Sequence, residues 1–179
     1  MCSICDLRIE FSIDHPLGLS VAVETRRAID AGLLPEPEDA DGAPAGMQLR
    51  LSAIETLRTA QQRLEWTQRQ DELLALPDFF VLMVESRTWG FFHPTPNGFD
   101  PNCRPAPPNV LADDIAERDA VLVSSEVAMR QIVEGRLPFE RALEERIIAL
   151  DADGSRFDKL LGAWSKAYPK VGFSRFVCA

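Results

Sequence analysis

The stretch that decides the fold of this chain runs from Arg118 to Tyr168 and reads RDAVLVSSEVAMRQIVEGRLPFERALEERIIALDADGSRFDKLLGAWSKAY. It begins with a short apolar, β-branched run at Ala120–Val123, which predicts a strand. Ser124 or Ser125 then stands where a helix N-cap belongs, and the apolar spacing after them predicts a helix that ends near Gly135. The stretch therefore opens with a strand and a capped helix.

The second half of the same stretch continues this alternation of strands and helices. Pro138 suits the first turn of a short helix over Phe139–Glu144. The apolar run Ile147–Leu150 is too short for a helix and predicts a strand, and a turn over residues 151–155 follows it. A last amphipathic helix is marked by one apolar stripe, made of Phe157, Leu160, Leu161 and Trp164.

This order of elements resembles the C-terminal half of the sterol carrier protein type 2 family. The resemblance rests on the motif E-G-R-L at Glu134–Leu137, on Ala142 in the short helix, and on the succession of strand, helix, short helix, strand and amphipathic helix. It implies a sterol-carrier-protein-like α+β fold and a site for a hydrophobic small molecule, such as a lipid, a sterol or an acyl chain. The function that it implies is binding rather than catalysis.

The same resemblance implies an apolar cavity between the sheet and the helices, lined by aromatic and aliphatic side chains. The residues that we expect to line it are Phe80, Leu82, Trp89, Phe91, Met129, Ile132, Leu161 and Trp164. Ordinary core packing is the alternative explanation for such a set, because aromatic side chains dominate the cores of small domains that bind nothing.

The N-terminal part of the chain predicts a β–α unit over residues 1–34. Leu7–Ile13 alternates apolar and polar residues, as in a strand with one buried face. Asp14 suits the cap of a short amphipathic helix that ends near Gly32. Residues 35–46 combine proline, glycine and acidic residues without periodicity, so we expect an acidic linker there.

The middle of the chain predicts one helix and an aromatic hairpin. A capping-box spacing precedes a helix over Ala53–Leu74. Phe79–Val84 and Thr88–Phe92 read as two neighbouring strands rich in aromatic residues. Pro94–Pro108 is dense in proline and predicts an irregular connection, after which Val110–Glu117 has room for a single helical turn.

Length and composition fit one globular domain. The chain has 179 residues, of which 46% are hydrophobic and 26% charged, as in ordinary soluble domains. We therefore predict a single α+β domain over residues 1–179, in which a mostly antiparallel sheet is covered on one face by helices. Composition leaves the oligomeric state open.

The charge and the hydropathy pattern exclude two classes of partner. The 28 acidic and 19 basic residues give a net charge of −9, which repels phosphate backbones, so nucleic acid is not an expected partner. No apolar run is long enough to span a membrane, and the N-terminus lacks the apolar region of an export signal. We expect a cytoplasmic protein.

One candidate metal site involves the N-terminus. Cys2 and Cys5 have the spacing of one edge of a tetrahedral zinc site, and His15 and His93 are the histidines that would complete it. Such a zinc would be structural, since four protein ligands leave no open position for a reacting water. Because no second paired spacing exists, free thiols and two unrelated histidine turns are the alternative that we favour.

No sequence pattern predicts catalytic residues, since neither a nucleophile elbow nor a facing pair of carboxylates is present. The leading hypothesis is a non-catalytic binding module for a hydrophobic small molecule. The alternative is an interaction or regulatory subunit that docks a protein partner through its acidic surface and the proline-rich loop Pro94–Pro108, because long irregular loops in compact domains are often functional.

Overall fold

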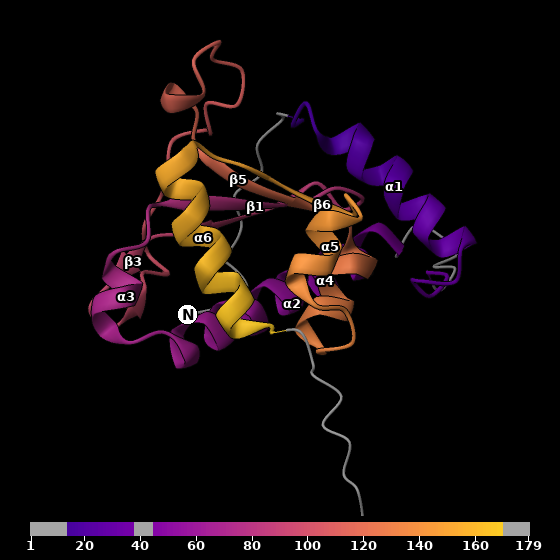
Figure 1. Ribbon diagram of the computed structural model, residues 1–179, viewed down its shortest axis with the longest axis horizontal. Coiled ribbons are helices and arrows are strands. Elements are labelled where there is room, and N and C mark those ends of the chain that lie inside the picture. Colours follow the sequence, from indigo (N-terminus) through magenta and orange to yellow (C-terminus); the bar gives the residue numbers. More distant parts are fainter. Residues whose placement is uncertain (1–13, 38–44, 170–179) are drawn as a thin grey trace, which may run out of the picture.

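A four-stranded sheet lies at the centre of the molecule (Figure 1). The computed structural model describes residues 14–37 and 45–169. Within them the strand order is β2-β1-β5-β6, so that β1 and β5 are central. The bounds are Phe79–Met83 for β1, Thr88–Phe92 for β2, Ala120–Ser124 for β5 and Ile148–Asp151 for β6.

The two outer pairings of this sheet are antiparallel and the central one is parallel. β1 pairs antiparallel with β2 across a short turn, and β5 pairs antiparallel with β6. β1 and β5 run parallel, with Phe79 opposite Ala120 and Met83 opposite Ser124. The predicted fold class, α+β with a mostly antiparallel sheet, is confirmed.

Most of the helices pack against one side of the sheet, which we call the main face (Figure 1). They are α2 (Ala45–Thr67), α4 (Glu126–Val133), α5 (Phe139–Glu144) and α6 (Gly154–Ala167). Their apolar stripes bury the odd-numbered side chains of β1 together with Leu122 of β5. The residues that are fully buried there include Leu57, Leu64, Met129, Phe139 and Trp164. The main hydrophobic core therefore lies on this face.

The opposite side of the sheet, the α1 face, carries a smaller core. Helix α1 (Gly18–Asp30) lies there and places Val21 against alternate residues of the strands. The cluster consists of Val21, Phe80, Leu82, Trp89, Val110, Val121 and Val123. Helices cover one face of the sheet, as predicted. In addition, one helix of the described residues, α1, lies on the other face. The predicted amphipathic stripe of this helix is confirmed, since Val21, Thr25 and Ala28 are buried.

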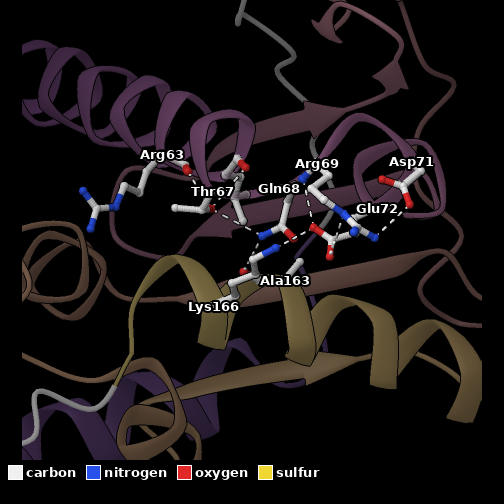
Figure 2. Close-up of polar contacts among 9 residues, drawn as sticks. Arg63, Thr67, Gln68, Arg69, Asp71, Glu72, Ala163 and Lys166 are labelled. Atoms are coloured by element: carbon white, nitrogen blue, oxygen red, sulfur yellow. Dashed lines mark hydrogen bonds and ion pairs between the residues drawn. The ribbon is translucent and has the colours of Figure 1, made fainter.

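The predicted helix over residues 53–74 is wrong in its bounds. Helix α2 begins earlier, at Ala45, and ends at Thr67. A separate short helix, α3 (Gln70–Leu74), follows it. The break coincides with contacts to α6, because the Gln68 side chain donates to the carbonyl of Ala163 at 3.1 Å (Figure 2). Hydrogen bonds to a distant part of the chain thus take precedence here over the local preference of the sequence for a continuous helix.

Residues 94–108 are less irregular than predicted. They include a small hairpin of β3 (Pro94–Thr95) and β4 (Gly98–Phe99). The Phe99 backbone N–H donates to Glu65 of α2 at 2.8 Å, which fixes the hairpin to that helix. Gly98 has a φ of +120°, and a Cβ there would lie 2.8 Å from the same carboxylate, so glycine is required. The predicted helical turn is confirmed as η1 (Ile115–Glu117).

The stretch from Arg118 to Tyr168 folds as predicted. Ser125, rather than Ser124, caps α4 by accepting a hydrogen bond from the Ala128 N–H. Gly135 ends that helix with a φ of +73°, the conformation for which glycine is favoured. Helix α5 has the predicted bounds, and β6 differs from its prediction by a single residue at each end.

Candidate functional site

The eight predicted ligand-lining residues divide between the two faces of the sheet. Four of them, Phe80, Leu82, Trp89 and Phe91, lie on the α1 face. The other four, Met129, Ile132, Leu161 and Trp164, pack on the main face. The sheet separates the two groups, so they do not line one common cavity. The physical reason is that neighbouring strand residues point to opposite faces, whereas the helical residues belong to stripes that cover one face.

The group on the α1 face includes an aromatic cluster made by Phe80, Trp89 and Phe91. Phe80 lies edge-on to Trp89 with ring centroids 6.1 Å apart, and its centroid is 4.8 Å from that of Phe91. The hairpin register explains this arrangement, because Phe80 is opposite Phe91, and opposite residues share a face. The cluster is a largely buried set of interlocking aromatic rings on the two strands β1 and β2.

Among the described residues, fewer elements cover the aromatic cluster than cover the main face. Helix α1 contributes Val21 to this core, Leu17 just before the helix packs against it, and the segment before β5 contributes Val110. The main face is covered by α2, α4, α5 and α6 together. An apolar surface under a single helix can be uncovered by moving fewer groups than a surface under several packed helices.

A buried polar cluster joins α1 to the sheet at the edge of this face. His15, just before α1, places its Nε2 atom 3.2 Å from Oδ2 of Asp151 at the end of β6. Arg118 approaches the same oxygen at 3.7 Å. The side chain of His15 is fully buried, and Asp151 is opposite Val121, so its carboxylate lies on the α1 face. We call His15, Asp151 and Arg118 the latch.

The hydrogen bonds of the latch define the state of the histidine. Nδ1 of His15 accepts the backbone N–H of Leu17 at 3.1 Å, so the ring proton of the neutral form is on Nε2 and faces Asp151. The contact of Nε2 with Asp151 is close, but it does not have the geometry of a hydrogen bond. Burial lowers the pKa of His15, and the Arg118 charge lowers it further, against the opposing effect of Asp151. The histidine is therefore neutral at neutral pH.

A second carboxylate cluster lies at the ends of the parallel strands, where no sequence pattern predicts one. Glu126 in the first turn of α4 accepts the backbone N–H groups of Glu85 and Ser86 at 3.1 and 2.6 Å. Glu85 in turn accepts the backbone N–H of Glu126 at 3.0 Å. Burial raises the pKa of Glu85.

The reciprocal bonds show what this pair does. Each carboxylate binds backbone groups of the other's segment, so the pair links the β1–β2 turn to the start of α4. Only the parallel pairing of β1 and β5 brings Glu85 and Glu126 together, and no local sequence signal predicts that pairing. We assign the pair a structural role.

The candidate zinc ligands are not assembled in the described part of the chain. Cys2 and Cys5 lie outside the described residues. His15 contacts Asp151 on the edge strand β6, while Nδ1 of His93 is 2.8 Å from Asp78 beside the opposite edge strand, β2. The two histidines therefore do not share a site. Within residues 14–37 and 45–169, no group of three or more metal-ligating side chains is placed to hold an ion.

Comparisons with protein-family models, with curated proteins and with solved structures gave no match for this chain. Among the helices of the described residues, none combines the length and the apolar character that crossing a bilayer requires. The functional interpretation therefore rests on the geometry of the aromatic cluster and its latch.

Proposed function

We propose that this protein is a non-catalytic binding module for a hydrophobic small molecule, and that the ligand binds on the α1 face of the sheet. The observation that carries the proposal is the aromatic cluster of Phe80, Trp89 and Phe91 under a cover to which the described chain contributes a single helix. Clustered aromatic side chains favour apolar ligands through burial and ring contacts. The resemblance of Arg118 to Tyr168 to sterol carrier proteins supports the same ligand class.

The latch gives this face a defined way to open. Movement of the start of α1 away from the strands would break the contact of His15 with Asp151 and expose Leu17 and Val21, while Ala28 at the other end of the helix belongs to the main core. The main face would open only if several helices separated from the sheet. Ligand entry on the α1 face therefore requires the smaller rearrangement.

The test is titration of the delipidated full-length protein with a fluorescently labelled fatty acid. Phe79 and Phe80 are adjacent buried residues on opposite faces, so Phe80→Ala and Phe79→Ala are a matched pair. We expect saturable binding by the wild type, a loss of about tenfold or more in affinity for Phe80→Ala, and a change of less than about twofold for Phe79→Ala. Circular dichroism verifies that both variants are folded at the temperature used.

Two results would contradict the proposal. Absence of saturable binding by the delipidated wild type, confirmed by native mass spectrometry, removes the function. Equal loss of affinity in both variants shows that the ligand does not bind on the α1 face.

A further inference from the structure

A segment next to the sheet, residues 109–119, presents large apolar side chains to solvent. It belongs to the loop that projects at the top of Figure 1 and includes η1. Leu111 is 72% exposed and Ile115 is 45% exposed. Exposed side chains of this size, close together in the sequence, are a common mark of an interaction surface. The segment adjoins the α1 face, since its Val110 packs in that core and its Arg118 belongs to the latch, but Leu111 and Ile115 themselves are exposed to solvent.

The backbone of this segment is held in place by two arginines. Nε of Arg118 donates to the Ala112 carbonyl at 2.6 Å. Arg156 of α6 donates to the Arg118 carbonyl at 2.7 Å and to the carbonyls of Ile115 and Ala116 at 3.2 Å each. The segment is therefore arranged before any partner binds, and a preorganised surface loses less conformational entropy on association.

The charges beside the two apolar side chains are acidic. Asp113 and Glu117 are exposed, and neither has an ion-pair partner among the residues that the structure describes. Asp114 uses its carboxylate to cap η1. The guanidinium groups of Arg118 and Arg156 are turned to backbone carbonyls, as well as to Asp151 and Asp153. The segment thus combines apolar contact area with uncompensated negative charge.

Helix α1 supplies an internal comparison. Its outer side also exposes two apolar residues, with Leu19 at 77% and Val23 at 42%. The charged residues that follow on the helix pair with one another: Arg27 with Glu24 and Arg26 with Asp30. The two apolar pairs are similarly exposed, but only the pair in residues 109–119 lies among unpaired charges of one sign.

We infer that residues 109–119 form a docking surface for a protein segment in which lysine or arginine flanks apolar residues. Apolar side chains of the partner cover Leu111 and Ile115, and its basic side chains pair with Asp113 and Glu117. Charge complementarity of this kind guides association and selects partners. The acidic flank disfavours a membrane surface, because biological bilayers carry negative charge at their surface.

The experiment records amide NMR spectra of the full-length protein during titration with short synthetic peptides. The probe peptide contains lysine, leucine and glycine, and two reference peptides replace its lysine by glutamate or its leucine by serine. We expect the probe peptide to shift the amides of residues 109–119, and both reference peptides to bind at least about tenfold more weakly. Added salt weakens the probe complex because the charges are exposed.

A matched pair of variants identifies the surface. The double variant Leu111→Ser/Ile115→Ser should lose about tenfold or more in affinity for the probe peptide, whereas Leu19→Ser/Val23→Ser should change it less than about twofold. Asp113→Asn/Glu117→Gln should weaken binding and reduce its salt dependence. All of the substituted side chains are exposed, so the variants are expected to fold.

Three results would overturn the inference. The first is a set of amide shifts spread over the acidic surface instead of residues 109–119. The second is equal loss of peptide affinity in the two apolar double variants. The third is binding to vesicles of phosphatidylcholine and phosphatidylglycerol that Leu111→Ser/Ile115→Ser abolishes, because the surface would then be a membrane contact.

Discussion

The two faces of the central sheet are built from the same strands but differ in what covers them. On the main face, α2, α4, α5 and α6 enclose a large core around Leu122. On the α1 face, a smaller cluster around Leu82 lies beneath α1, and the latch holds that helix at the sheet edge. Alternate residues of one strand thus belong to a large core on one side and to a smaller core on the other, where we propose that the ligand enters.

The largest expected effect separates the two faces by stability. Leu122 and Leu82 are buried leucines on neighbouring central strands, one on each face. We expect Leu122→Ala to lower the free energy of unfolding by about 4–5 kcal/mol, and Leu82→Ala by about 2–3 kcal/mol, because the smaller core, to which the described residues contribute one helix, collapses more readily around the missing atoms. Urea unfolding of both variants measures the difference. Equal losses would mean that the faces are equally rigid.

A smaller effect is expected at the latch. His15→Ala removes one of the two side chains that approach Asp151 within the described residues, and leaves that carboxylate buried with Arg118. We expect a loss of about 1–3 kcal/mol in the free energy of unfolding, with faster hydrogen exchange in α1 than in α6. His93→Ala is the control: His93 is partly exposed and stacks on Phe91, so its loss should cost less stability than His15→Ala and should not speed exchange in α1. Uniform acceleration of exchange would refute local opening.

The pH dependence of stability should also distinguish the α1 face. Because burial lowers the pKa of His15, the unfolded chain binds that proton more readily than the folded chain. The free energy of unfolding is therefore highest above the pKa that His15 has in the unfolded chain, about 6.5. It falls as the pH drops below that value, by at most about 1.4 kcal/mol per pH unit. Urea midpoints between mildly alkaline and mildly acidic pH should therefore fall more for the wild type than for His15→Ala. Parallel curves would show that the latch does not titrate.

The smallest expected effect is at Glu85, in the turn between β1 and β2. It tests whether the loss of stability in acid is due to His15. Burial raises the pKa of Glu85, so its contribution to the free energy of unfolding has the opposite pH dependence to that of His15. The contribution is present below the pKa of Glu85 in the unfolded chain and is lost as the pH rises through the pKa in the folded chain. Glu85→Gln removes this titration and keeps an oxygen that can accept the Glu126 N–H. We expect slightly higher stability at neutral pH, measured by thermal unfolding, and a slightly larger loss on acidification, because the offsetting gain from protonation of Glu85 is removed. A weakened acid loss would assign part of it to Glu85.

The sequence predicts the fold better than it predicts the candidate site. The Ser125 cap, the bounds of α5 and the two strands of the aromatic hairpin follow from local signals. The assignment of side chains to faces does not, because every residue of β1 is buried and its apolar run gives no alternation. The sequence therefore predicts one cavity for Phe80 and Trp164, although the sheet separates them.

Two features need contacts between distant parts of the chain. The pairing of His15 with Asp151 depends on where α1 lies, which no spacing in the sequence encodes. The break in the helix at Gln68 depends on a carbonyl of α6. Both are tertiary contacts that local pattern cannot supply.

The parallel pairing of β1 with β5 has a consequence for folding kinetics. The β1–β2 hairpin and the unit from β5 to β6 can each form from contacts nearby in the sequence, but Phe79 meets Ala120 only after the intervening chain has closed a long loop. We expect this closure to limit the folding rate. Stopped-flow refolding should then slow on Val81→Ala, whose side chain lies at the central pairing, and change little on Ala163→Gly in α6, even where both variants lose equilibrium stability.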